Sequence, residues 1–192
     1  MTLQTTISIT VEGQTPPLSA SISYSPSDIV ETGQSFTVSV NPSGGCGGYT
    51  YLWGDGYTGQ SQTFTENSVG TYSGHVTVTD SCGNSVTVDW SVTVESPPPQ
   101  FTSTTGCYKT ASGYTDVELS ATWEYGEGPF SWVYTWSDGT QQTGSDSSSS
   151  GGTASTSRSF PESSAEFSAD LTVTDSLGRQ ISTTVSATTI CS

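Results

Sequence analysis

His75 is the only histidine in the chain, and it is the first residue to test for chemistry, because histidine is the most frequent general base. A catalytic triad needs an acid and a nucleophile converging on the histidine from loops. His75 instead occupies an outward position of a predicted strand. Glu124 and Glu127 could form a glycosidase pair, but they fall in a turn-rich stretch with no sign of a cleft. The sequence also lacks a Gly-x-Ser-x-Gly elbow, an HExxH motif and a glycine-rich phosphate loop. We therefore predict that the protein is not an enzyme.

Four cysteines form the second candidate set: Cys46, Cys82, Cys107 and Cys191. Four cysteines allow three disulfide pairings. A zinc site is the alternative, but the chain has no CxxC motif and only one histidine to supply further ligands. We expect disulfides and no bound metal.

Aspartates at predicted turns form the third set. Asp55-Gly56 and Asp138-Gly139 are predicted turns, in which the carboxylate accepts backbone N–H bonds and the glycine takes a positive φ. Asp80 and Asp175 end two strands at inward positions, each followed by Ser-x-Gly, and we expect them to cap the next turn. Calcium is the alternative for Asp80 and Asp175, because the chain is acidic, but no DxDxDG loop is present. We predict no cofactor.

Aromatic side chains in predicted loops could stack on sugar rings. We expect most of them to pack over the ends of a sandwich, with glycan binding as the alternative; the residues are Tyr57, Tyr108, Tyr114, Tyr125 and Phe130. N-glycosylation is not expected, because Asn41 precedes proline and both Asn67 and Asn84 have the wrong third residue.

Composition and charge exclude two classes of partner. The formal net charge is −15, and Lys109, Arg158 and Arg179 are the only basic residues apart from His75. Nucleic acids and anionic membrane surfaces need a lysine and arginine footprint that this chain lacks. No run of 18 apolar residues occurs, so we expect no membrane insertion. The first residues lack a basic and an apolar region, so we expect no signal peptide in this chain.

Strands must position all of these residues, because the hydrophobic period is two. Apolar and aromatic residues alternate with Ser and Thr through several segments, including 36–40, 49–53, 72–78, 86–94, 117–123, 132–136 and 167–173. β-Branched residues dominate and no long segment has a 3.6-residue period, so helices should be nearly absent. The pattern predicts an all-β fold of antiparallel sandwiches, with Trp53, Trp136, Tyr72 and Phe167 in the cores.

The chain is an internal duplication. The sequence Tyr51-Leu-Trp-Gly-Asp-Gly56 returns as Tyr134-Thr-Trp-Ser-Asp-Gly139, and Val76-Thr-Val-Thr-Asp-Ser-Cys-Gly83 returns as Leu171-Thr-Val-Thr-Asp-Ser-Leu-Gly178. Twelve more residues separate these landmarks in the second copy, and we assign them to a flexible Gly/Ser-rich insertion at 144–157. Pro97–Pro99 forms a semi-rigid spacer between the copies. The predicted parts are an N-terminal strand or arm (1–13), sandwich 1 (14–96) and sandwich 2 (97–192).

These landmarks resemble domains of the polycystic-kidney-disease (PKD) type. The first copy carries Trp53-Gly-Asp-Gly56, Gly70-Thr-Tyr72 and the Val76–Gly83 strand and turn, but lacks the usual extra residues between Trp and Gly-Asp-Gly. The second copy departs further, with Phe167 in place of the tyrosine. The resemblance implies two immunoglobulin-like sandwiches of the kind found as extracellular spacers, adhesion modules or accessory units.

Within such a fold the cysteines should pair inside each copy. Cys46 and Cys82 lie in two loops that open at the same end of an immunoglobulin-like sandwich. Cys107 ends the first strand region of copy two and Cys191 ends the last strand, and these two strands run side by side and parallel. Each disulfide would stabilise its copy by about 3–5 kcal/mol. Disulfides without a signal peptide favour a virus particle, an exported fragment or a hyperthermophile cytosol.

Together these features predict a non-enzymatic structural or interaction protein displayed on an exterior surface, most simply as a virion turret, spike or decoration subunit, or as an appendage subunit. Its partners would be other protein subunits, and the arm could add to the sheet edge of a neighbour. Two alternatives remain: a carbohydrate- or receptor-binding adhesion module, and an accessory domain pair of a secreted hydrolase.

Overall fold

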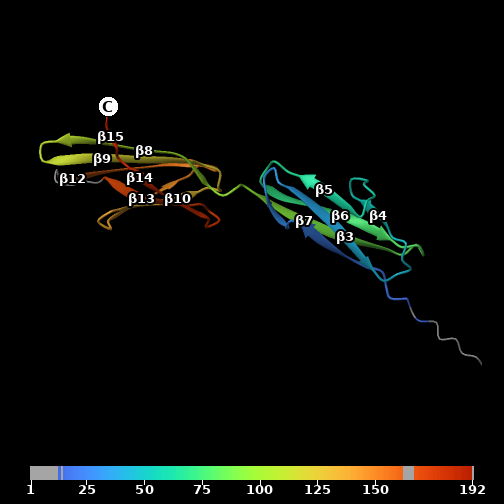
Figure 1. The fold of residues 1–192 in the computed structure, drawn as a ribbon. Coiled ribbons are helices and arrows are strands. Elements are labelled where there is room, and N and C mark those ends of the chain that lie inside the picture. Colours follow the sequence, from blue (N-terminus) through green and yellow to red (C-terminus); the bar gives the residue numbers. More distant parts are fainter. Residues whose placement is uncertain (1–12, 14, 162–166, 192) are drawn as a thin grey trace, which may run out of the picture. The chain divides into compact units, whose positions relative to one another are not determined.

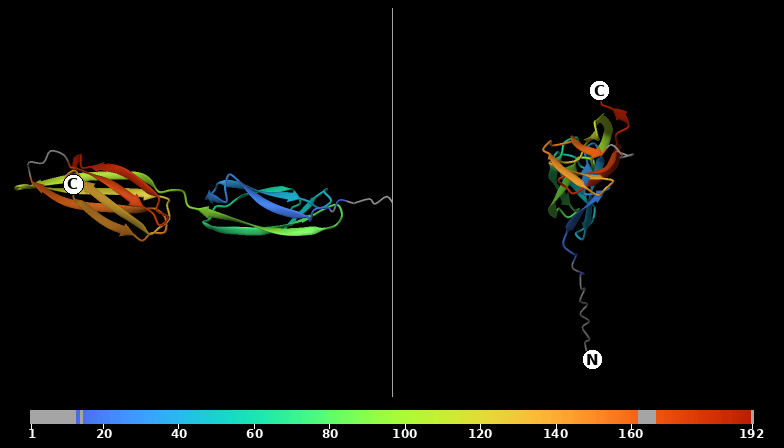
Figure 2. Two further views of the ribbon diagram at one scale, coloured as in Figure 1. Left: turned by 90° about the horizontal axis from the view of Figure 1, so that it is seen from below. Right: turned by 90° about the vertical axis from the view of Figure 1, so that its left-hand side faces the viewer.

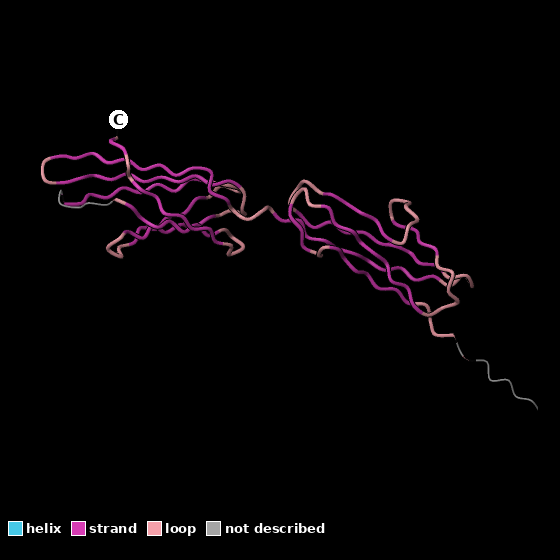
Figure 3. Tube along the Cα trace, viewed as in Figure 1, coloured by secondary structure: helices cyan, strands magenta, loops and turns pink. Residues whose placement is uncertain are grey.

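The structure is a computed structural model that describes residues 13, 15–161 and 167–191. These residues form strands, turns and loops without a helix (Figure 3), which confirms the all-β fold class. None of the described residues therefore belongs to a helix long and apolar enough to cross a membrane. The chain divides into two compact units between Val94 and Glu95.

Unit 1 is a sandwich of two sheets that lie face to face (Figure 1). One sheet has the strand order β1-β3-β5 and contains β1 (Ser19–Ser25), β3 (Ser35–Ser43) and β5 (Ser61–Thr65). The other has the order β2-β7-β6-β4 and contains β2 (Ile29–Glu31), β7 (Ser85–Glu95), β6 (Gly70–Thr79) and β4 (Thr50–Trp53). The β1–β3, β3–β5, β4–β6 and β6–β7 pairs are antiparallel.

The inner faces of unit 1 carry the alternating apolar residues. Alternate residues of the strands point towards the facing sheet, since successive side chains of a strand point to opposite faces. The buried apolar residues are Val30, Phe36, Val38, Val40, Trp53, Val76, Val78, Trp90, Val92 and Val94. Tyr72 lies half-buried against this core, and its hydroxyl donates to the carbonyl oxygen of Ser68 at 3.0 Å.

Unit 2 repeats the arrangement with extra strands (Figure 2). One sheet has the order β12-β9-β8-β15 and contains β12 (Gly152–Pro161), β9 (Tyr114–Glu124), β8 (Gln100–Ala111) and β15 (Thr189–Ile190). The other has the order β11-β10-β13-β14 and contains β11 (Gln141–Asp146), β10 (Phe130–Trp136), β13 (Ser168–Thr174) and β14 (Gln180–Ser186). The last strand, β15, runs parallel to β8, with Thr189 opposite Cys107.

The core of unit 2 is built by the same alternation. Its buried apolar residues are Val117, Leu119, Ala121, Trp123, Phe130, Tyr134, Trp136, Ala154, Phe160, Ala169, Leu171, Val173 and Val185. Phe167 lies half-buried against this core, next to the ring of Tyr108 at a centroid distance of 5.8 Å.

Hydroxyl groups pair across the strands on the outer faces. Thr37 and Thr63 approach to 2.9 Å between β3 and β5, as do Thr77 and Thr87 between β6 and β7. In unit 2 the hydroxyls of Ser120 and Ser155 lie 3.0 Å apart between β9 and β12. Such cross-strand pairs each stabilise a sheet by about 0.2–1 kcal/mol. The outer faces are thus polar with few charges.

The prediction of a flexible insertion at 144–157 is wrong. Residues 144–146 end β11 and residues 152–157 begin β12, which pair with β10 and β9 respectively. Asp146 caps the connection between them, because its carboxylate accepts N–H bonds from Ser148 at 2.8 Å and Thr153 at 3.0 Å. The extra residues of the second copy therefore form an additional edge strand and its turn.

Gly144 allows a direct test of whether residues 141–146 form an ordered strand. It lies opposite Trp132 in the β10–β11 pair, and a Cβ added there would overlap the indole ring of Trp132. We expect Gly144→Ala to lower the free energy of unfolding of unit 2 by about 1–3 kcal/mol, the usual cost of overpacking. Chemical denaturation followed by tryptophan fluorescence measures the change. Ser145→Ala, on the exposed face of the same strand, is the control and should change stability by less than about 0.5 kcal/mol. Equal stability of the two variants would contradict an ordered β11.

Candidate functional site

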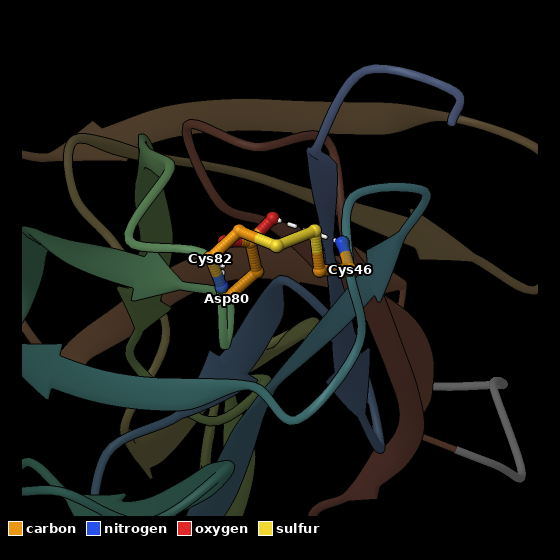
Figure 4. A group of neighbouring side chains, drawn as sticks. All are labelled: Cys46, Asp80 and Cys82. Carbon is orange, nitrogen blue, oxygen red and sulfur yellow. Dashed lines mark hydrogen bonds between the residues drawn. A yellow bond between two sulfur atoms is a disulfide. The ribbon is translucent and has the colours of Figure 1, made fainter. Parts of the chain in front are cut away.

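The most tightly bonded polar group of unit 1 is the Asp80 carboxylate, at the end of β6 (Figure 4). Only 5% of Asp80 is exposed. Its oxygens accept N–H bonds from the backbones of Cys46 (3.0 Å), Cys82 (3.0 Å) and Asn84 (2.9 Å), and from the Asn84 side-chain amide (2.9 Å). Cys46 and Cys82 are joined in a disulfide, with their Cα atoms 5.8 Å apart. The carboxylate thus ties together both loops that the disulfide links.

These bonds favour the ionised carboxylate. The Asn84 side-chain amide, followed by the Cys46 N–H, lowers the pKa of Asp80 from 3.8 to about 2. A calcium ion needs about six to eight oxygen ligands, whereas the groups facing Asp80 are N–H donors. The surroundings of Asp80 fit a turn cap and do not fit a calcium site.

Two groups of side chains have the composition of metal ligands within the described residues, namely Cys46 with Asp80 and Cys82, and Cys107 with Glu118 and Cys191. In both groups the two sulfur atoms are joined in a disulfide. Because zinc binds thiolates, neither group can hold the metal in this state.

Asp175 has the corresponding position in unit 2, at the end of β13, with 4% of the residue exposed. It accepts N–H bonds from Leu177 (3.1 Å) and Arg179 (2.9 Å) and forms an ion pair with the Arg179 guanidinium at 2.7 Å. Burial raises the pKa of Asp175, but the bonds from Arg179 and from the Glu127 N–H outweigh it and leave the pKa lowered. Arg179 therefore replaces the Asn84 amide of unit 1.

The second disulfide joins Cys107 to Cys191, with a Cα–Cα distance of 5.0 Å. The sequence analysis placed Cys107 at the end of a strand, but Cys107 lies inside β8. Cys191 follows β15, and its N–H donates to the carbonyl oxygen of Tyr108 at 2.9 Å. The disulfide fixes the last strand to the first.

The Gly-Asp-Gly and Ser-Asp-Gly turns follow β4 and β10. The Asp55 carboxylate accepts the Tyr57 N–H at 3.0 Å, and the Asp138 carboxylate accepts the Thr140 N–H at 3.0 Å. Gly56 and Gly139 have φ values of 90° and 81°, a region that glycine adopts without strain.

A side chain from the facing sheet reaches each of these carboxylates. In unit 1 the Gln62 amide donates to Asp55 at 2.6 Å, and this bond is the largest cause that lowers the pKa of Asp55. In unit 2 the Arg158 guanidinium donates to both oxygens of Asp138, at 2.9 and 2.6 Å, and lowers the pKa of Asp138. Neither Gln62 nor Arg158 stands out in the sequence, because each bonds to a turn aspartate that only the folded sheets bring beside it.

His75 is exposed on β6, opposite Asp89 of β7. Its ring lies against the backbone of Gly54, where an added Cβ would come within 3.1 Å of the imidazole. Glu127 accepts the Ser96 N–H at 3.1 Å, and Glu124 is exposed at the end of β9. Among the described residues, no contact brings these groups together as a catalytic set.

The five aromatic residues proposed for glycan stacking do not form one surface. Phe130 is 1% exposed within β10, and Tyr108 packs half-buried in β8, so their placement in loops was wrong. Tyr57, Tyr114 and Tyr125 are exposed by 45%, 61% and 41% and lie on different turns and strand ends. The packing interpretation thus holds for Phe130 and Tyr108.

A pocket of about 500 Å³ opens in unit 1 between β5 and β6. Aromatic rings form one part of its wall and polar side chains the other; the lining includes Trp53, Phe64, Tyr72, Trp90, Asp55, Gln62, Glu66 and His75. The rings of Phe64 and Trp90 have a centroid distance of 4.9 Å. No local sequence pattern indicates this pocket, because β4, β5, β6 and β7 each contribute residues to its lining.

A larger hollow of about 750 Å³ lies in unit 2. Hydroxyl groups dominate its lining, together with Glu118, Gln142 and the half-buried Trp132. Such a surface offers donors and acceptors around one aromatic ring. It could hold a polar, uncharged ligand.

Comparisons with known proteins identify no family. No family model and no curated protein matches the sequence. Among solved structures, the fibronectin(III)-like modules of Clostridium thermocellum CbhA are 14% identical, with 89% of this chain and 95% of that chain covered and a TM-score of 0.36. Carbohydrate-binding modules of the β-sandwich superfamily are 14% identical over 91% and 86% of the chains, with a TM-score of 0.35. A Ca²⁺-stabilised adhesin of an Antarctic bacterium is 19% identical over 94% and 50%, with a TM-score of 0.34.

The bonds to Asp80 predict a specific dependence of stability on pH. The folded-state pKa is about 2 and the ordinary value is 3.8, so the stabilisation by this carboxylate is complete above pH 4 and is lost as the pH falls towards 2. Asp80→Asn should lower the melting temperature of unit 1 at pH 7. The substitution replaces one carboxylate oxygen by an NH₂ group, which cannot accept the N–H bonds that this oxygen accepts in the native protein. The gap between the two proteins should narrow from pH 4 to pH 2, as measured by calorimetry. A constant gap across this range would show that the charge of Asp80 does not stabilise the turn.

Proposed function

We propose that the protein is a non-enzymatic structural and interaction component displayed outside a cell or on a virus particle, as a turret, spike, decoration or appendage subunit. The observation that carries this proposal is the presence of one disulfide within each compact unit. Disulfides persist in oxidising surroundings such as secreted proteins and the surfaces of cells and virions. The two units would act as separate PKD-type domains, 14–96 and 97–192.

The outer faces support display on a surface. Their exposed hydroxyls bond to one another across the strands, as in the Thr37–Thr63 and Thr172–Ser182 pairs. The net charge of −15 disfavours non-specific association of the chains. A polar face with few basic groups suits an exterior protein whose specific contacts are confined to a few places.

The N-terminal arm would supply one such contact. The predicted strand at 1–13 falls almost wholly outside the described residues, and its sequence Thr-Ile-Ser-Ile-Thr-Val alternates as a strand would. An extended segment of this kind can add to the open edge of a sheet in a neighbouring subunit, using backbone hydrogen bonds for affinity.

Carbohydrate or receptor binding is a second candidate, favoured by the hollow of unit 2. Hydroxyl groups, Gln142, Glu118 and the Trp132 side chain surround about 750 Å³ there, a combination suited to sugar hydroxyls. A glycan array tests this function, with Trp132→Ala as the control that should abolish any signal from this hollow.

Assembly through the arm is testable with the purified protein and with particles. We expect the full chain to co-purify with a larger particle and to self-associate in light scattering after size exclusion. Replacing Ile7 and Ile9 by serine should abolish the association, because it removes the apolar face of the arm. Replacing Thr6 and Thr10 by serine keeps the alternation and should leave the association unchanged. A chain that is strictly monomeric and absent from particles would contradict the proposed function.

A further inference from the structure

The unit 1 pocket exists because the two edge strands beside it are short. Strand β4 ends at Trp53, which pairs with Val76, whereas β6 extends back to Gly70. The first half of β6 thus has no strand beside it on that edge within the described residues. The opening leads to the rings of Trp53, Phe64 and Trp90.

The corresponding place in unit 2 is filled from within. The Arg158 guanidinium forms two hydrogen bonds to Asp138 and lies over two aromatic rings, 5.7 Å from the centroid of Trp136 and 4.8 Å from that of Phe160. A carboxylate on one side and ring faces on the other are the surroundings that a guanidinium prefers.

Unit 1 has the same frame without the cation. Gln62 on β5 lies two residues before Phe64, as Arg158 on β12 lies two residues before Phe160, and both bond to the aspartate of the turn after the tryptophan strand. The rings correspond as well, since Trp53 and Phe64 lie 6.4 Å apart and Trp136 and Phe160 lie 5.2 Å apart. Gln62 is uncharged, and among the described residues its buried Oε1 atom has no hydrogen-bond partner.

The pocket therefore presents acceptors that need a donor. Asp55 and Glu66 contribute carboxylates, and the described residues give the Glu66 carboxylate no hydrogen bond or ion pair. Residues 1–96 contain no lysine or arginine that could supply the cation. The aromatic rings and the two carboxylates favour a positively charged donor over an anionic or purely apolar ligand.

We propose that the unit 1 pocket, formed by Trp53, Asp55, Gln62, Phe64 and Glu66, binds an arginine side chain of a partner protein in the manner in which unit 2 holds its own Arg158. This inference rests on the proposed function as an interaction protein and names the chemistry of one contact. The guanidinium would bond to the exposed Asp55 carboxylate and lie against the half-buried ring of Phe64.

The test uses the full chain, an arginine probe and its uncharged isostere. Nα-acetyl-arginine amide should shift the amide resonances of residues around the pocket in a nuclear magnetic resonance titration, whereas Nα-acetyl-citrulline amide should not. Asp55→Asn should weaken binding by about tenfold, which corresponds to about 1.4 kcal/mol. Nα-acetyl-lysine amide should bind more weakly than the arginine probe, because an ammonium cannot form the two parallel bonds of a guanidinium.

Two substitutions give each unit the residue of the other unit at the equivalent position, and they make the test decisive. Gln62→Arg should fill the pocket from within, abolish probe binding and raise the melting temperature of unit 1 by about 4 °C. Thr63→Arg adds the same charge to the outward face of the same strand and should leave probe binding unchanged. Arg158→Gln should open the corresponding place in unit 2 and create a second site for the probe.

Shifts confined to other surfaces, equal binding of the citrulline probe, or undiminished binding by Gln62→Arg would each overturn the proposal. Binding of the probe does not require assembly of the protein. If the chain joins particles but the probe fails to bind, the arginine pocket alone is wrong. If the probe binds but the chain joins no particle, the exterior role is wrong and the pocket stands.

Discussion

The packing of two inner sheet faces, rich in valine and aromatic residues, is the constraint on which each unit depends. A strand that buries one face must place every second residue towards the facing sheet. In unit 1 this puts Val38, Val76 and Val92 at zero exposure, and it fixes Trp53 at the end of β4. Once Trp53 is buried, the next residues must turn out of the core, and the Asp55 carboxylate at the turn faces the edge of the opposite sheet. The position of Asp55 beside the pocket follows from that burial.

The same constraint explains how much the sequence could predict. Period-two alternation predicted β3, β4, β6, β7, β9, β10 and β13, which supply much of both cores. Inward aspartates followed by Ser-x-Gly were placed at the ends of β6 and β13. Alternation fails where inward residues are small or polar. Residues 144–157 contain only glycine, serine, threonine, alanine and aspartate, yet Ala154 is fully buried and Gly144 leaves room for Trp132. Their order comes from the neighbouring strands, which no local pattern records.

The pockets could not be predicted for a related reason. Their walls depend on strand length and on which strands lie at an edge, and both are properties of the assembled sheets. Gln62 is an ordinary polar residue in the sequence, and Arg158 directly follows the stretch 144–157 that composition alone assigned to a flexible insertion. The register of β5 with β3 brings Gln62 to Asp55, and the register of β12 with β9 brings Arg158 to Asp138.

The duplication separates what the fold requires from what each unit has acquired. Both units keep a buried aspartate after the central strand, but its side-chain donor is Asn84 in unit 1 and Arg179 in unit 2, so the fold requires a donor and not a particular charge. At the turn after the tryptophan strand, the two units differ in whether a cation pairs with the aspartate. Arg158 neutralises Asp138 within unit 2, whereas Gln62 leaves Asp55 its charge and leaves the rings beside it open to a pocket. Stability alone would favour the filled arrangement, because a paired carboxylate and a cation over aromatic rings are both favourable. We therefore expect the open arrangement to stabilise unit 1 less than Arg158 stabilises unit 2, and a ligand that supplies a cation would recover the difference.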